Sequence, residues 1–352
     1  MERETEIRNL INMIEPVSEE AKKQCILRWN GIAKPLHSLG KLEDGIVQIA
    51  GIIRTQEVKL AKKALVIMCA DNGVVAEGIS QCGQEITALV AENFLEKNSC
   101  ACIMADRAGA DVYPIDIGMV TDTKVPGKKI AYGTRNFAIE QAMTREEALS
   151  AIKVGIEMVA SLKAKGYQII ATGEMGIGNT TTSSAIAAVM LGVDVCEVTG
   201  KGAGLSETGL RRKIKVIKNA IEMHKPDPPD PIDVVSKVGG FDIAGLTGIF
   251  LGGAIYKIPT VIDGFISSVA ALLASKIDTR VIEYMLPSHL SEEAAGGLIL
   301  KALSMQPYLT CNMCLGEGTG AVSLFPLLDM ALDIYEKMST FQQISMEAYR
   351  PL

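Results

Sequence analysis

The sequence predicts an α/β protein whose mostly parallel, Rossmann-like sheet is covered by helices on both faces. Short apolar runs of strand length alternate with longer segments in which apolar residues recur at helical spacing. The runs are almost continuously apolar, as in strands buried on both faces, and this alternation is typical of parallel sheets. The predicted strands span residues 64–70, 111–117, 167–172 and 259–262.

Helices are predicted before, between and after these strands. Residues 1–30 form one or two amphipathic helices, because Ile7, Leu10, Ile11 and Ile14 follow helical spacing. Further helices are predicted at 85–108, 146–163, 183–191, 206–223, 239–256 and 266–276, with a proline-rich loop at 225–231. The last third of the chain is mostly helical, with breaks at 286–289 and 315–321 and a helix at 322–332. Since the terminal helices have no strands to cover, we expect a large α/β domain at 31–285 and a small helical domain from 1–30 plus 286–352.

The composition narrows the possible functions. The 352 residues are 48% hydrophobic, enough for a sizeable core, and a net charge of −6 without a long basic stretch disfavours a nucleic-acid partner. The N-terminus is charged and lacks the apolar segment of a secretory signal, and no apolar run approaches the roughly 20 residues that cross a bilayer. We therefore expect a cytoplasmic protein that binds neither nucleic acid nor membrane.

The eight cysteines are scattered, and Cys311 and Cys314 form the single C-x-x-C pair. Such a pair could be half of a redox or metal site. No second C-x-x-C accompanies it, and His37, His224 and His289 are far apart in the sequence. Buried, reduced thiols without a metal are therefore the favoured interpretation.

Polar residues follow the predicted strands at the points where the strands end. They are Asp71, Asn72, Asp116, Glu174 and Asp263. Because the carboxyl ends of parallel strands meet at one edge of a sheet, and ligands bind beyond that edge, these residues predict a binding site there.

The most informative turn is Gly-Glu-Met-Gly-Ile-Gly-Asn-Thr-Thr-Thr at residues 173–182. A strand, a glycine-rich turn and a helix start together build an anion cradle, because glycines allow close backbone approach and the free N–H groups point at the ligand. Glu174 would repel a phosphate, so it suggests a ligand with a sugar hydroxyl or a cationic ring. A dinucleotide site is disfavoured by the G-x-x-G-x-G order and the mid-chain position. An ordinary tight turn stays open.

Two further glycine-rich turns carry charged residues. Residues 200–204 precede a helix with Arg211, Arg212, Lys213, Lys215 and Lys218, where Lys213 could place a point charge on a phosphate or simply lie on a solvated face. Residues 316–320 place Glu317 between glycines. Glu317 is either a general base whose pKa is raised by partial burial, or a cap of the following helix.

Together the three turns resemble the family of nicotinate-nucleotide:dimethylbenzimidazole phosphoribosyltransferases. The matching segments occur in the family's order at 38–43, 69–74, 173–181, 233–242, 263–265, 287–289 and 315–321. The resemblance implies a Rossmann-like sheet, a small helical domain from both termini, and a homodimer whose subunits lie near each other's sites.

The resemblance also implies a reaction. Nicotinate mononucleotide gives its phosphoribosyl group, with inversion, to an aromatic base, which yields an α-linked ribotide and nicotinate for cobalamin-type cofactors without a metal or other cofactor. Glu317 matches the family's base, and Glu174 matches a residue at the ribose. The nucleotide and phosphate surroundings are matched by Gly176, Ile177, Gly178, Asn179, Gly202, Ala203 and Lys213, and the nicotinate vicinity by Ser291.

The acceptor pocket is implied at Ser80, Leu89 and Leu315, where this chain departs from the family. Cys82 and Gly83 stand where an aromatic residue and a proline are common, and residues 88–90 are apolar where some members carry glutamine. Dimethylbenzimidazole, another benzimidazole, adenine or a phenol therefore all stay open as acceptors.

A phenol would give an O-glycoside, and because diverged paralogues of this family form phenol-activating heterodimers, a heterodimer is open as well. A nicotinamide-dependent oxidoreductase is less favoured. A non-catalytic partner subunit is disfavoured because both glutamates are retained.

Overall fold

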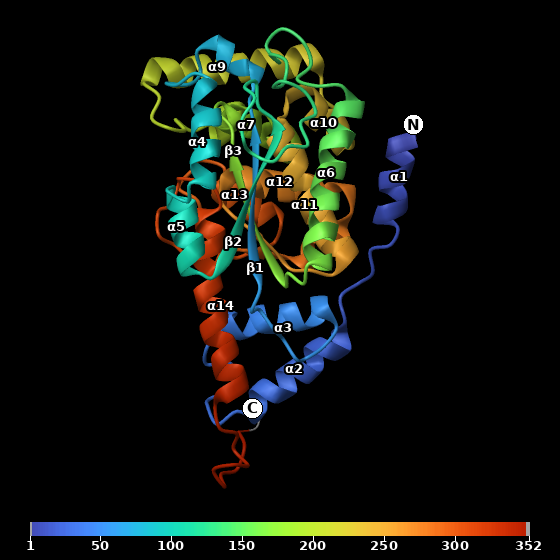
Figure 1. The fold of residues 1–352 in the computed structure, drawn as a ribbon, viewed down its shortest axis with the longest axis vertical. Helices are drawn as coiled ribbons and strands as arrows, with labels where there is room; N and C mark the ends of the chain where they lie inside the picture. Colours follow the sequence, from blue (N-terminus) through green and yellow to red (C-terminus); the bar gives the residue numbers. More distant parts are fainter. Residues whose placement is uncertain (1, 350–352) are drawn as a thin grey trace.

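The computed structural model describes residues 2–349 and has a five-stranded sheet at its centre (Figure 1). The strands are β1 (Lys63–Ala70), β2 (Ala110–Gly118), β3 (Ile169–Met175), β4 (Thr260–Ile262) and β5 (Met285–Pro287). They lie in the order β2-β1-β3-β4-β5, and every neighbouring pair is parallel. All carboxyl ends therefore lie at one edge. The strand order reverses between β1 and β3, which is where ligands bind in such sheets.

The structure confirms the predicted α/β class and refines two strands. β3 begins at Ile169 and runs on to Met175, so Glu174 lies in the strand rather than in the turn after it. β5 occupies part of the predicted break at 286–289. Pro287 is tolerated there because β5 is an edge strand, which needs no N–H donor on its open side.

Helices cover both faces of the sheet, as predicted. One face carries α6 (Arg145–Ala164), α11 (Phe241–Tyr256) and α12 (Phe265–Ile277), and the other carries α4 (Glu85–Leu95), α5 (Cys100–Arg107) and α14 (Thr319–Lys337). Successive residues of β1 supply both layers, because side chains alternate across a strand. Val66 and Met68 belong to the core with α11, whereas Leu65 and Ile67 belong to the core with α14.

The remaining helices surround this three-layered centre. They are α1 (Glu2–Ile11), α2 (Glu19–Gly31), α3 (Lys41–Ile53), α7 (Asn179–Leu191), α8 (Val195–Val198), α9 (Glu207–His224), α10 (Pro231–Val238) and α13 (Gly296–Ala302), with 3-10 turns at Gly73–Glu77 and Thr279–Tyr284. Among residues 2–349, no helix is both long enough and apolar enough to cross a bilayer.

The terminal helices do not all lie together. α1 packs on α6, whereas α2 packs on α3 and α3 packs on α14. In Figure 1, α2, α3 and the end of α14 gather below the sheet, at the amino ends of its strands. The division into a domain at 31–285 and a small helical domain from 1–30 plus 286–352 stays a prediction.

Three helical predictions were incomplete. The single helix expected at 85–108 is divided into α4 and α5, because Ser99 starts a new helix by accepting a hydrogen bond from the Cys102 N–H at 3.1 Å. α3 was not predicted. α10 begins inside the proline-rich stretch, where Asp230 caps the N–H groups of Ile232 and Asp233 and Pro231 occupies the first turn, which needs no N–H from it.

Candidate active site

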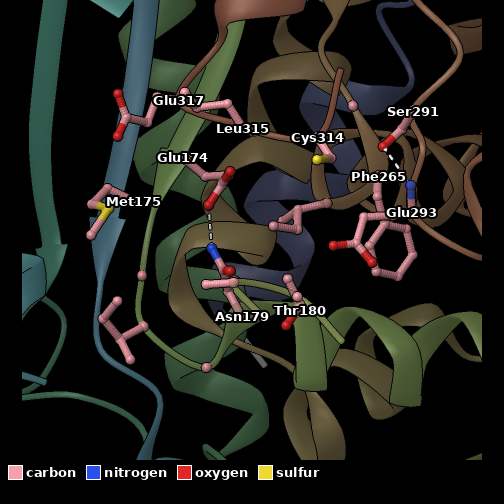
Figure 2. A pocket seen from close by; sticks show the side chains of 18 of the residues that line it. Glu174, Met175, Asn179, Thr180, Phe265, Ser291, Glu293, Cys314, Leu315 and Glu317 are labelled. Atoms are coloured by element: carbon pink, nitrogen blue, oxygen red, sulfur yellow. Dashed lines mark hydrogen bonds between the residues drawn. The ribbon is translucent and has the colours of Figure 1, made fainter. Parts of the chain in front are cut away.

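A cavity of about 200 Å³ opens at the carboxyl edge of the sheet (Figure 2). It is lined by the end of β3, the start of α7, the glycine-rich segment after α8, the residues after β4 and β5, and the turn before α14. Of the residues predicted at the strand ends, Glu174 and Asp263 line the cavity, whereas Asp71, Asn72 and Asp116 do not. Of those that the family resemblance implies, Lys213 and Leu89 lie outside the lining. Those that line the cavity are Ser80, Glu174, Gly176, Ile177, Gly178, Asn179, Gly202, Ala203, Ser291, Leu315 and Glu317.

Glu174 lies in the floor of this cavity and is only 6% exposed. The side-chain amide of Asn179, the first residue of α7, donates hydrogen bonds to Glu174 and, at 3.0 Å, to Asp242. The Glu174 carboxylate also accepts a hydrogen bond from the backbone N–H of Glu317. Two of the three glycine-rich turns therefore meet at this one carboxylate.

Burial shapes the charge of the cavity floor. It raises the pKa of Glu174 to about 8, with the negative charge of Asp242 acting in the same direction. Burial likewise raises the pKa of Asp242 to about 7 and raises that of Asp263. A cationic group in the cavity, or positive charge that develops on a bound ligand, would stabilise the ionised forms of these acids.

Glu317 is held in an unusual backbone conformation. Its φ is +59°, in the left-handed region, and it lies between Gly316 and Gly318, each with φ of +87°. A non-glycine residue in this region costs on the order of 1–3 kcal/mol and is found mainly where the surrounding structure and a function require it. The turn lies so close to β3 that a β-carbon on Gly173 would come within 2.6 Å of the Glu317 carbonyl oxygen.

Asp263, the residue after β4, holds the same turn in place through hydrogen bonds. Its two carboxylate oxygens accept hydrogen bonds from the N–H groups of Gly318 and Ala321, each at 3.0 Å. The Glu317 side chain is half-buried, and burial, assisted by the negative charge of Asp263, raises its pKa. In Figure 2 the Glu317 carboxylate lies on the Met175 side of the cavity, whereas Phe265, Ser291 and Glu293 lie on the opposite side.

Lys213 does not line the cavity but supports its wall from behind. The side chain is fully buried, and its ammonium donates to Thr180 Oγ1 at 2.8 Å and to the Gly200 carbonyl at 3.2 Å. It therefore ties the start of α7 to the second glycine-rich segment. Burial lowers its pKa to about 8. The interpretation of the basic cluster as one solvated face is wrong for Lys213 alone, since Arg211, Arg212 and Lys215 are exposed.

The predicted acceptor residues are only partly together. Ser80 and Leu315 line the cavity, but Leu89 lies outside its lining, on α4, with 62% of its surface exposed. The helical register explains the difference: the neighbouring residues Thr87 and Ala88 turn inward. Thr87 Oγ1 accepts a hydrogen bond from the Ile177 N–H at 3.1 Å and so links α4 to the cradle.

Several lining or supporting residues were not predicted as site residues. Thr87 carries no local signal, because its role depends on a neighbour that is distant in the sequence, whereas Asp242 lies at the end of the segment 233–242 that resembles the family. Asn72 and Asp263, by contrast, were among the strand-end residues that predicted a binding site. Met175, Phe265 and His289 also line or border the cavity, and His289 lies within a segment that resembles the family. The His289 ring is buried beside Gly320 and Ser288, with Ser288 Oγ 3.0 Å from Nδ1.

The cysteines correct one expectation. Cys25, Cys69 and Cys102 are buried, but Cys82, Cys100, Cys196, Cys311 and Cys314 are exposed, and Cys314 lies at the cavity. Cys311 and Cys314 belong to the irregular segment between α13 and α14. In the described part of the chain, no group of three or more His, Cys, Asp or Glu side chains could hold a metal ion.

Comparisons with known proteins agree with this arrangement. A family model described as "Phosphoribosyltransferase" matches residues 14–345. The nicotinate-nucleotide–dimethylbenzimidazole phosphoribosyltransferase of Ruminiclostridium cellulolyticum is 48% identical over 97% of this chain and 98% of its own length, and that of Clostridium acetobutylicum is 48% identical over 98% and 99%. The crystal structure of CobT from Thermus thermophilus superposes with a TM-score of 0.87 at 37% identity, over 93% of this chain and 99% of that one. The chain therefore belongs to the nicotinate-nucleotide–dimethylbenzimidazole phosphoribosyltransferase family.

Proposed function

We propose that the chain transfers the phosphoribosyl group of nicotinate mononucleotide to an aromatic lower-ligand base, giving an α-linked ribotide and nicotinate for cobamide biosynthesis. The observation that carries this proposal is the presence of two glutamates from distant segments, Glu174 and Glu317, in one cavity at the carboxyl edge of the sheet. The relatives that match over nearly the whole chain carry names that describe this transfer.

The substrate would lie across the cavity. The phosphate and ribose would meet the N–H groups at the start of α7 and the backbone of Gly202 and Ala203, since a helix start and glycine-rich backbone favour anions. Lys213 would hold this cradle together and add positive charge behind it. The nicotinate would lie near Ser291.

The transfer needs a base and a stabiliser of positive charge. Glu317 would remove the acceptor proton while the acceptor nitrogen forms a bond to C1′ of the ribose. The bond from C1′ to the nicotinate nitrogen breaks, and its electron pair stays with the nicotinate. Positive charge develops on the sugar meanwhile, and the carboxylate of Glu174 would stabilise it. Attack on the face opposite the leaving group gives the inverted, α-linked product.

The raised pKa values suit these roles. A base works best near neutral pH when its pKa is raised, as burial does for Glu317. A cationic nicotinate nucleotide beside Glu174 would favour the ionised carboxylate and thereby improve its own binding. No metal or other cofactor is required by this scheme.

The assembly and location of the protein belong to the same proposal. We infer a homodimer, which exposed apolar side chains such as Leu89 and Ile103 on the neighbouring helices α4 and α5 would favour. Light scattering of the purified chain tests this state. A cytoplasmic location agrees with a charged, phosphorylated substrate that does not cross a bilayer.

The direct experiment incubates the purified chain with nicotinate mononucleotide and a panel of benzimidazoles, adenine and phenols, and identifies the products by mass. We expect an α-linked N-ribotide with a benzimidazole and equimolar release of nicotinate. Exclusive formation of O-glycosides, or turnover only with a paralogous subunit, would favour a phenol-activating heterodimer instead. Absence of any transfer would exclude the proposal.

A further inference from the structure

Polar side chains from three separate elements meet directly behind Glu174. Asn72 follows β1, Asn179 begins α7, and Asp242 lies in the first turn of α11. The amide of Asn179 donates to both Glu174 and Asp242, the latter at 3.0 Å, so one amide group bridges two carboxyl groups. Both carboxyl groups and both amides are at least nine-tenths buried.

Two oxygens in this cluster lack a hydrogen-bond donor. Asp242 Oδ1 and Asn72 Oδ1 are buried and accept no hydrogen bond of regular geometry from residues 2–349, although the N–H groups of Asp242 and Ile243 interact with the Asp242 carboxyl group. Both border the α-carbon of Gly240, where a β-carbon would collide with each of them. Rotating the Asn72 amide does not help, because its Nδ2 donates to the Ile177 carbonyl at 3.3 Å and a rotated amide would set its oxygen against that carbonyl. The cluster is therefore short of one hydrogen.

We propose that Asp242 is a protonated positioning residue, whose neutral carboxyl group donates a hydrogen bond to Asn72 and accepts one from Asn179. Through Asn72 it holds Ile177 of the cradle, and through Asn179 it holds the carboxylate of Glu174. The inference rests on the proposed function, because the group that it positions is the one assigned to the ribose. A neutral Asp242 also removes a negative charge beside Glu174, which leaves Glu174 free to be the anion of the pair.

The charges of the cluster support a shared proton. Burial raises the pKa of Asp242 to about 7 and that of Glu174 to about 8, and adjacent carboxylates resist joint ionisation. The N–H groups at the start of α11 lower the pKa of Asp242, but burial has the larger effect. The hydrogen-bond partners of the two acids then decide where the proton resides. Glu174 faces N–H donors from Asn179 and Glu317, whereas Asp242 Oδ1 is unpartnered and borders Gly240 together with the unpartnered Asn72 Oδ1. Burial can keep a carboxylic acid neutral so that it donates a hydrogen bond.

The test compares the substitutions Asp242→Asn and Asp242→Ala in the full-length protein. An amide donates and accepts as the neutral acid does, so Asp242→Asn should keep kcat within about threefold of the unsubstituted enzyme, whereas Asp242→Ala should lose on the order of a hundredfold from misplacement of Glu174. As a matched control, Asp263→Asn should lose at least about tenfold. Both Asp263 oxygens accept backbone N–H groups, and an amide cannot do so.

A second readout needs no activity. The infrared spectrum of the unsubstituted enzyme at neutral pH should contain the C=O stretch of a protonated carboxyl group. Difference spectra against each variant should show that this band disappears in Asp242→Asn and persists in Glu174→Gln. Loss of carboxylate bands alone in Asp242→Asn, or equal impairment of Asp242→Asn and Asp242→Ala, would overturn the inference. Failure of the proposed transfer would leave the infrared result intact, so the two proposals fail separately.

Discussion

The carboxylate of Asp263 accepts a hydrogen bond from the backbone N–H of Gly318 at 3.0 Å and so holds the turn that presents Glu317. Asp263 follows β4, and Gly318 precedes α14, 55 residues later in the chain. The candidate base therefore owes its position to a buried acid, whose negative charge also raises the pKa of Glu317.

Replacing Glu317 by glutamine should preserve the fold and remove the base. We expect kcat to fall by roughly 10²–10⁴, the usual contribution of general base catalysis, with little change in KM for nicotinate mononucleotide. Steady-state rates with a benzimidazole acceptor measure this. Glu292→Gln, which changes an exposed glutamate outside the cavity lining, should keep the normal rate. Near-normal turnover of Glu317→Gln would exclude the base assignment.

The pH dependence should report the environment of Glu317. The base must be ionised, and burial with the charge of Asp263 raises its pKa above the ordinary 4.5, so kcat/KM should rise with pH along a limb centred above 4.5. The residual activity of Glu174→Gln should show the same rise of kcat/KM with pH, which would assign the limb to Glu317 rather than to Glu174. A limb centred at or below 4.5 would contradict the prediction.

Gly173→Ala should disturb the Glu317 turn without touching a charged group. The new β-carbon would lie 2.6 Å from the Glu317 carbonyl oxygen. Because this oxygen belongs to the backbone and no flexible side chain can move aside, the turn must shift. We expect kcat to fall at least about tenfold, and the free energy of unfolding to fall by about 1–3 kcal/mol, as for other overpacked sites. Gly31→Ala is the control, since nothing lies within 4 Å of its β-carbon. Equal rates in both variants would show that the turn has room to move.

Lys213→Met should weaken nucleotide binding more than it slows chemistry. The substitution removes donors to Thr180 and the Gly200 carbonyl, and a hydrogen bond from a charged group contributes about 1.5–3 kcal/mol. KM for nicotinate mononucleotide should rise about ten- to hundredfold, with a smaller change in kcat. Lys215→Met, on the exposed side of the same helix, should behave as the unsubstituted enzyme. A selective loss of kcat in Lys213→Met would point to a role in the chemical step.

The pH dependence of stability should differ between the unsubstituted chain and Asp242→Asn. Asp242 has an ordinary pKa of 3.8 and a folded-state pKa of about 7, so the folded state holds an extra proton between these values. The stability from this group is complete below pH 3.8 and is lost as the pH rises to about 7. The negative charge of Asp71, the residue after β1, acts in the same direction, and Glu174 shares the Asn179 amide with Asp242. Denaturant unfolding measured between these pH values should show that the free energy of unfolding falls more steeply with pH for the unsubstituted chain than for Asp242→Asn. Parallel pH dependences of the two chains would refute the raised pKa of Asp242.

Much of this molecule was predictable because the relevant patterns are local. Continuous apolar runs identified β1, β2 and β4, and the glycine-rich turns pointed to Glu174, Asn179 and Glu317 before any geometry was known. β5 and α10 were missed because prolines were interpreted as breaks. An edge strand and the first turn of a helix both tolerate proline, and only the finished sheet shows which strand is the edge.

The acceptor side shows the opposite case. The assignment of Leu89 to the acceptor pocket by resemblance stays a prediction. Its side chain is exposed on α4, and the sequence cannot show this, because a shift of one or two residues along the helix separates an inward side chain from an exposed one and residues 85–95 are apolar on several sides. Thr87, which faces inward and holds Ile177, has no distinguishing local pattern. Its role comes from a partner 90 residues away.

The sequence by itself determined the α/β class, the family and the residues that could do the chemistry, because strand periodicity, glycine-rich turns and family motifs are properties of short segments. Tertiary structure alone decided how those residues are charged and aimed. Burial sets the pKa values of Glu174, Asp242 and Glu317, and burial is the sum of contacts from many distant segments. The support of the Glu317 turn by Asp263, and of the cradle by Lys213 and Thr87, likewise exists only after the chain has closed around its sheet.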